Sequence, residues 1–266
     1  MPTDVEAVSL AERAAATAPS DPAIAWVRIM ACYDAATCDI HAASRNMRTL
    51  DPGNAAGWVA DFRDAASVDA AHGIDGMLAD MAADGHFDVY FNALVIRTAE
   101  ALHAARSSGP TAVPGDDAAQ ALVGAIGLVS IIPMFQGLGR ACTAPETRAA
   151  RRSECLEITR VMLLGDMSFV QAMGNAIRTR LLKPGTPECE AQQAWLRTFE
   201  WRAQQLLAVN ARAGYSAQWA SEQMSLMRKL PREEDVVLET LRRANIALEP
   251  PADWRPDAPP HPCAGP

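Results

Sequence analysis

The stretch DPGNAAGW, residues 51–58, is a second version of SDPAIAW, residues 20–26. Their tryptophans, Trp26 and Trp58, are 32 positions apart. Three further pairs recur at a spacing of 31 positions: His41 with His72, Met47 with Leu78, and Leu50 with Met81. A period of about 31–34 residues that holds two helices is typical of helix-hairpin repeats. The sequence therefore predicts stacked helical hairpins in this region.

The composition around this stretch favours helix over strand. The chain has 266 residues, of which 49% are hydrophobic, so it can bury a sizeable core. Runs of Val, Tyr or Thr at period two are few, and we expect an all-α protein. The expected helices lie at about 4–17, 22–33, 38–50, 54–67, 72–83, 87–107, 117–132, 134–141, 146–164, 166–182, 188–211, 216–229 and 232–246.

The clearest break in the chain is RSSGPTAVPGDD, residues 106–117. It predicts a helical-hairpin array at 1–107 and a second multi-helix portion at 117–248. A short array cannot bury its end faces alone, so we expect the second portion to pack on the array as a cap. Residues 249–266 are rich in proline and should form an extended tail.

Helix ends are marked by specific residues in three places. KPGTPE, residues 183–188, predicts Thr186 as an N-cap with Pro187 at the first helical position. LPREED, residues 230–235, places acidic residues in a first turn, where the helix dipole favours them. DGHFD, residues 84–88, predicts a turn with Gly85 in a left-handed cap and a helix that begins at once after it.

Charge and hydropathy argue against two classes of partner. The net charge is −8 and the basic residues do not gather into a stripe, apart from RAARR at 148–152, which argues against nucleic-acid binding. The most apolar run, residues 121–135, is shorter than the ~20 residues of a membrane span and predicts a buried helix. The first residues lack a signal-peptide pattern, so either the protein is cytoplasmic or the sequence is a mature or trimmed form.

Cys32 and Cys38 lie six positions apart with His41 close behind. In one unbroken helix their α-carbons would be too far apart for a disulfide, but a hairpin corner between them would permit one. Two alternatives stay open. Both thiols could be free, or the cysteines could bind a metal together with His41 and His72, although the spacing is not that of a common zinc site.

The remaining cysteines favour pairing. Cys142 ends one expected helix and Cys155 lies in the next, so an antiparallel pair of helices could join them. This leaves Cys189 with Cys263 by elimination. Three bridges would suit an oxidising compartment, so we expect a periplasmic or cell-envelope location if the cysteines pair and a cytoplasmic one otherwise.

Motifs for catalysis and cofactors are missing from the sequence. It has no Gly-x-Ser-x-Gly elbow, no His-Glu-x-x-His pair and no phosphate-binding glycine loop. A single histidine in a helical protein is usually structural, and His86 and His103 have no partner at helical spacing. We assign no catalytic, cofactor-binding or metal-binding residue, and an enzyme is the less favoured class.

Aromatic residues mark one expected helix. In AWLRTFEWRAQQLL, residues 194–207, Trp195, Phe199 and Arg202 share one stripe. Such a stripe is usually part of a core. Tryptophan and arginine together are also typical of binding hot spots, so these three residues are the candidate partner surface.

The stretch LDPGNAAGW, residues 50–58, resembles the junction between tetratricopeptide repeats, where one helix ends and the next begins with a large apolar residue. The resemblance covers residues 21–86 as two degenerate units. Four positions depart from the family pattern: Phe62, Ala65, Ile74 and His86. The resemblance implies helical hairpins without a standard peptide groove. The cysteine-bearing hairpins and IALEPPADWRP, residues 246–256, also resemble uncharacterised helical-repeat envelope proteins of Gram-negative bacteria.

These observations favour non-enzymatic binding of a protein or peptide partner in the bacterial envelope, in a scaffolding, assembly or effector-neutralising role. The alternative is an enzyme, or a carrier of a small apolar ligand, with a pocket between the helices at 121–135 and 156–182. A pocket lined by polar groups with displaced pKa values would favour the alternative, and exposed Trp or Arg would favour a partner.

Overall fold

The computed structural model describes residues 4–33, 35–63, 73–107, 117–129, 134–145 and 148–255. Every regular element among these residues is a helix, and one isolated bridge joins Asn54 to His86. The all-α class is therefore confirmed for the described chain. The helices are α1 (Asp4–Thr17), α2 (Pro22–Cys32), α3 (Ile40–Leu50), the 3₁₀ helix η1 (Ala55–Phe62), α4 (Ile74–Ala83), α5 (Phe91–Ser107), α6 (Asp117–Val129), α7 (Phe135–Thr143), α8 (Arg152–Leu163), α9 (Ser168–Leu181), α10 (Pro187–Ala213), α11 (Ala217–Met227) and α12 (Glu233–Arg243).

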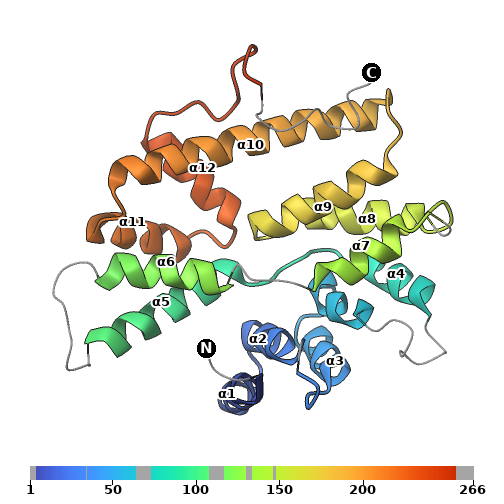
Figure 1. Cartoon of the computed structure of the whole chain (residues 1–266), viewed down its shortest axis with the longest axis horizontal. Helices are drawn as coiled ribbons and strands as arrows, with labels where there is room; N and C mark the ends of the chain where they lie inside the picture. Colours follow the sequence, from blue (N-terminus) through green and yellow to red (C-terminus); the bar gives the residue numbers. More distant parts are fainter. Residues whose placement is uncertain are drawn as a thin grey trace. The chain divides into compact units, whose positions relative to one another are not determined.

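The chain forms two compact units. The first comprises Met1–Tyr90, Ile132–Gly165 and Val170–Leu181, and the second comprises Phe91–Ile131, Asp166–Phe169 and Leu182–Pro266. The helices on either side of the expected boundary at 107–117, α5 and α6, both belong to the second unit. These two helices pack on each other in the second unit, whereas residues 108–116 between them lie outside the described chain (Figure 1).

Successive helices pack on one another at the start of the first unit: α1 on α2, α2 on α3, and α3 on η1 (Figure 1). Short polar side chains begin three of them, because Asp21, Asp39 and Asn54 each accept a backbone N–H of the helix that follows. Asp21 and Asp51 have different roles despite the sequence echo. Asp51 closes α3, and Gly53 with φ +84° carries the chain to the cap at Asn54.

The helix expected at 54–67 is observed as the shorter 3₁₀ helix η1, and residues 64–72 lie outside the described chain. Gly57 explains how closely η1 approaches α3. A Cβ at Gly57 would lie 2.8 Å from the side chain of Arg48, so that side chain would have to move to admit a larger residue.

The prediction for DGHFD was wrong. Residues 84–90 run outside helix, α5 begins at Phe91, and Gly85 is not among the glycines with positive φ. The reason is non-local. Gly85 and His86 donate their N–H groups to the carbonyl of Gly53, and Ala55 donates to the carbonyl of His86. These bonds hold the segment beside the start of η1.

Helices from later in the sequence complete the first unit. α7 packs on η1, and α8 packs on α4. At Gly137 of α7 a Cβ would lie 2.5 Å from the carbonyl oxygen of Phe62, so glycine is required for this approach. Phe135 at the start of α7 packs on Phe87, with 5.9 Å between ring centroids.

In the second unit, α11 packs on α5, α6 and α12, while α10 packs on α12. Asp166, buried, accepts the N–H of Phe91 at 2.8 Å and so caps α5. Glu233 at the start of α12 accepts the N–H of Ser168 at 2.6 Å. These two acids tie together chain segments that are far apart in the sequence.

Two further expectations concern membranes and the tail. Within the part of the chain that is described, no helix combines the length and apolarity that crossing a bilayer requires. Of the expected extended tail, 249–255 is described and has no helix, whereas 256–266 lies outside the described residues.

Candidate functional site

α10 carries the predicted partner surface. Thr186 caps this 27-residue helix by accepting the N–H of Cys189, and Pro187 occupies its first position, as predicted. Gly214, with φ +68°, ends it. Apart from Cys189 and Gln192, no residue of α10 is buried. Most of this long helix is therefore available at a surface.

Trp195 and Phe199 form a stacked pair on α10. Their ring centroids lie 5.0 Å apart and their planes differ by 18°. Both side chains are half-buried, so the pair remains partly open to solvent. The four-residue spacing places them one turn apart on the same face. The structure thus brings together two of the three residues predicted from the sequence.

Arg202, the third predicted residue, is held by the chain itself. Its guanidinium donates to the carbonyl of Leu248 at 3.0 Å, to Glu234 at 3.2 Å and to Glu249 at 3.0 Å. Its side chain is 20% exposed. Arg202 therefore borders the aromatic pair in a fixed position, with most of its donors in use.

A neighbouring face of α10 binds the segment 247–255, which runs back along the helix after α12 (Figure 1). Arg197 donates to the carbonyls of Pro251 and Trp254. Thr198 donates to the carboxylate of Glu249 at 3.0 Å. The side chains of this face therefore contact a proline-containing segment largely through its main-chain carbonyls.

Trp201 and Trp254 anchor the segment at its two ends. The indole N–H of Trp201 donates to the carbonyl of Ala247 at 2.9 Å. The two indole rings meet edge to face, with centroids 5.6 Å apart. The sequence placed Trp201 on a separate face from Trp195 but did not reveal this partner. The proline-rich EPPADW, residues 249–254, was the available signal.

Two glutamates of the second unit sit in environments that disfavour their charge. Burial raises the pKa of Glu233, although the backbone N–H of Ser168 acts in the opposite direction. Burial also raises the pKa of Glu200 on α10, whose Oε2 is buried without a hydrogen-bond partner. Both carboxyls are therefore harder to ionise than a glutamate in water.

The first unit contains a cluster of hydrogen-bonded polar side chains that sequence reasoning missed. Asp51 accepts hydrogen bonds from Asn54 at 2.9 Å and from Tyr90, and its Oδ2 lies 3.2 Å from His86 Nε2. Burial acts to raise the pKa of Asp51, but these three hydrogen bonds outweigh it and the pKa is lowered. Burial, followed by the bond to Asp51, raises the pKa of Tyr90.

Asn54 shows what this cluster does. Its side chain donates to the carbonyl of Asp88 and accepts the N–H of the same residue at 3.0 Å. Tyr90, at φ +57°, turns the chain towards α5 directly afterwards. The cluster therefore holds residues 84–90 against the turn after α3. Most of its hydrogen-bonding groups already bind other groups of the same cluster.

A second polar chain lies next to it. Asp61, which is 4% exposed, accepts from Arg48 at 2.6 Å, and its other oxygen lies 2.6 Å from Nδ1 of His41. The guanidinium of Arg48 also lies over the ring of Trp58, 3.8 Å from its centroid. Trp58 in turn donates to Asp84 at 3.0 Å, and burial raises the pKa of that carboxyl. These contacts lock η1 onto α3.

Two of the expected cysteine pairs are brought together. Cys32 and Cys38 form a disulfide across the corner between α2 and α3, with α-carbons 5.2 Å apart. Cys142 and Cys155 join α7 to α8, with α-carbons 5.6 Å apart. Cys189 is buried in the first turn of α10. Its expected partner, Cys263, lies outside the described residues, so that pair stays a prediction.

The pairing of Cys32 with Cys38 removes the thiolates that the metal alternative needed. His41 faces Asp61 instead, and His72 lies outside the described chain. Among the described residues, no three His, Cys, Asp or Glu side chains are grouped to hold a metal ion.

The pocket expected between 121–135 and 156–182 would join segments that belong mainly to different compact units, and it stays a prediction. No family model, no curated protein and no solved structure matches this chain.

Proposed function

We propose that the protein binds a protein partner through α10 and catalyses no reaction on it. The observation that carries this proposal is the half-exposed stack of Trp195 on Phe199. Aromatic residues and arginine dominate the energy of protein interfaces, particularly where a pocket or ring is already in its bound arrangement. Arg202 beside the pair is fixed by three hydrogen bonds, so little of its freedom would be lost on binding.

The neighbouring face of α10 supports a peptide segment as the partner's contacting part. Arg197 and Trp201 already bind a proline-containing stretch of the same chain. A proline-containing peptide loses little conformational entropy when it binds, because proline already restricts the unbound peptide. A partner that continues from this face onto Trp195 and Phe199 would use the same kind of contact.

A location in the bacterial envelope belongs to the same proposal. Two disulfides in a described chain of this size favour an oxidising compartment. The successive packing of α1, α2, α3 and η1 supports a tetratricopeptide-like array, which is a common scaffold for binding proteins. The role we propose is that of a scaffold, an assembly factor or a neutraliser of an effector protein.

The proposal is tested by capture from an envelope extract of the organism that encodes the protein. The full chain is compared with the double variant Trp195→Ala/Phe199→Ala and with Leu207→Ala. Leu207 is a fair control because it lies on the same helix and is 64% exposed. We expect the wild type and the control to retain one protein in a stoichiometric amount, and the double variant to lose it.

Two results would contradict the proposal. The first is a chain that retains no stoichiometric protein from such an extract. The second is a captured protein that the double variant retains as well as the wild type does, with circular dichroism showing that both are folded.

A further inference from the structure

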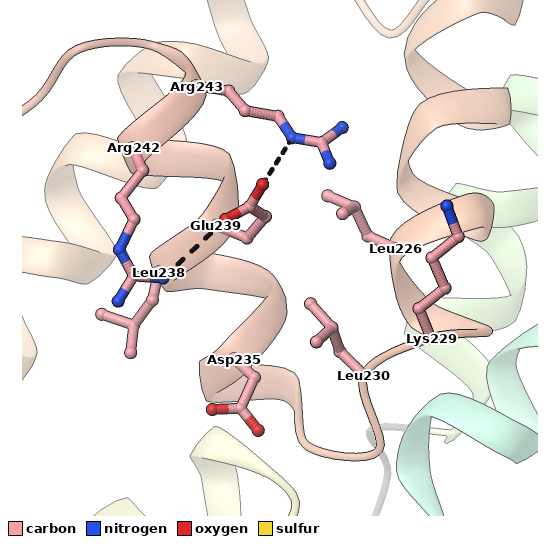
Figure 2. Close-up of a pocket in the computed structure, with 8 residues that line it drawn as sticks. All are labelled: Leu226, Lys229, Leu230, Asp235, Leu238, Glu239, Arg242 and Arg243. Atoms are coloured by element: carbon pink, nitrogen blue, oxygen red, sulfur yellow. Dashed lines mark hydrogen bonds and ion pairs between the residues drawn. The ribbon is translucent and has the colours of Figure 1, made fainter.

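A pocket of about 320 Å³ lies between the end of α11 and α12 (Figure 2). Leu226 and Leu230 form its wall on the α11 side, and Leu238 forms the wall on α12. This volume lies at the small end of the range of ligand pockets, which is about 300–1,000 Å³. The pocket can therefore hold a small molecule with an apolar body.

The pocket is lined by a face of α12 that does not pack into the protein core. The core face of this helix consists of Val236, Val237, Thr240 and Leu241, which are all buried. Leu238 and Glu239 belong to the adjacent stripe, which continues one turn later at Arg242. A leucine on this stripe is only half-buried, so it is placed to contact something besides the core.

Charges around the leucines are unequal. Lys229, Arg242 and Arg243 contribute three cations, against the carboxylates of Asp235 and Glu239. Glu239 forms ion pairs with both arginines, at 2.9 Å to Arg243 and 3.8 Å to Arg242. Lys229 has no carboxylate partner anywhere in the described chain.

The charges are also separated in space. In Figure 2 the ammonium group of Lys229 lies towards one end of the pocket, where Arg243 is paired with Glu239, and the carboxylate of Asp235 lies at the other end. Asp235 is in the first turn of α12, where the helix dipole stabilises a negative charge. The end that holds the ammonium group of Lys229 therefore favours an anion, and Leu226 and Leu230 lie close to it.

We propose that this pocket binds a single-chain amphiphile with one negative charge, of the class of medium-chain fatty acids. The carboxylate pairs with Lys229 beside Arg243, and the alkyl chain lies over Leu226, Leu230 and Leu238. The lining contains no aromatic ring on which a base or sugar could stack. This site is separate from the α10 surface and does not depend on the function proposed for it.

The sequence offers an unusually clean test, because the chain has two lysines, Lys183 and Lys229. Reductive methylation with ¹³C-formaldehyde labels both lysines, together with the N-terminal amine, and preserves their charge. The full chain is then titrated with sodium decanoate below its micellar concentration and followed by NMR. We expect a saturable shift of the Lys229 signal at one-to-one stoichiometry, and no shift of the exposed Lys183.

Calorimetry with variants and ligand analogues completes the test. Lys229→Gln should weaken decanoate binding by up to about fivefold, the range for an exposed charge pair, and Lys183→Gln should leave it unchanged. A buried methylene group contributes about fourfold to affinity, so octanoate should bind at least threefold more weakly than decanoate. Decan-1-ol and decyltrimethylammonium should bind more weakly than decanoate.

Three results would overturn the proposal. One is the absence of a saturable shift at Lys229, and another is an equal shift at both lysines, which would indicate unspecific association. The third is a decan-1-ol affinity equal to that of decanoate, because it would show that the cationic end of the pocket has no part in binding.

Discussion

The indole N–H of Trp201 donates a hydrogen bond of 2.9 Å to the carbonyl of Ala247, a residue 46 positions later in the chain. The ring of Trp254 also packs edge to face on the ring of Trp201. One tryptophan of α10 thus contacts both ends of the segment 247–254. The segment follows α12 and is not helical, although the backbone N–H of Trp254 donates to the carbonyl of Pro251 within it. Its order therefore depends on side chains of α10.

Replacing Trp201 tests this dependence. We expect Trp201→Ala to speed amide hydrogen exchange in residues 247–255 by about tenfold or more. In this variant the segment can open without losing the hydrogen bond and the ring contact of Trp201, so opening requires less free energy. Trp201→Phe, which keeps a ring but removes the N–H, should give a smaller increase. Exchange measured by mass spectrometry decides the point, and unchanged rates in the alanine variant would show that the segment is held elsewhere.

Two glycines of α7 make a matched pair. A Cβ at Gly137 would meet the carbonyl of Phe62 at 2.5 Å, whereas a Cβ at Gly139 would meet nothing within 4 Å. We expect Gly137→Ala to reduce the free energy of unfolding by about 1–3 kcal/mol through overpacking. Gly139→Ala should raise it by about 0.5–1 kcal/mol, since alanine is the better helix former. Urea denaturation measures both, and equal effects would refute the close approach of α7 to η1.

Acid should weaken the contact between the turn after α3 and residues 84–90. The folded state lowers the pKa of Asp51 below its ordinary value of 3.8, so the ionised carboxylate stabilises the fold above that value. This stabilisation is lost as the pH falls through the folded-state pKa. We expect Asp51→Asn to cost about 1–2 kcal/mol at pH 7 and progressively less below pH 4.

The matched control for Asp51 is Asp80, an exposed residue of α4. Asp80→Asn should change the pH dependence of unfolding less than Asp51→Asn does, because the charge of Asp80 acts only as the last of the causes that shift the pKa of Asp84. Urea midpoints between pH 3 and pH 7 provide the measurement. A cost of Asp51→Asn that stays constant across this range would mean that the charge of Asp51 has no part in the cluster.

The bridge between α7 and α8 should be a substantial source of stability. Cys142 and Cys155 are 13 positions apart, and closing a loop of this size stabilises a protein by about 3 kcal/mol in the chain-entropy model. The double variant Cys142→Ser/Cys155→Ser should therefore unfold at lower urea concentration in the absence of reductant. With dithiothreitol the difference from wild type should narrow. Equal midpoints without reductant would show that the bridge is not formed.

Helices with strong local signals could be predicted from the sequence. Thr186 and Pro187 placed the start of α10 within one residue, because a cap and a proline act on the nearest turn. The acidic first turn at Glu233 was recognised in the same way. Stacked pairs such as Trp195 and Phe199 follow directly from helical spacing.

Features that depend on distant residues could not be predicted. Residues 84–90 leave helix because they bond to Gly53 and Ala55, about 30 positions earlier. The cap of α5 comes from Asp166, far along the chain, and the partner of Trp201 comes from the segment after α12. Periodicity reports which face of a helix is apolar, but it does not identify what covers that face.

The measurement that tests the central claim most directly is the affinity of the purified chain for its captured partner, by isothermal titration calorimetry. Loss of a hot spot costs about 2 kcal/mol or more, which corresponds to about 30-fold in the dissociation constant. We predict that Trp195→Ala/Phe199→Ala weakens binding by at least this factor, while Leu207→Ala changes it by less than about threefold. A dissociation constant that the double variant leaves unchanged would contradict binding through the α10 surface.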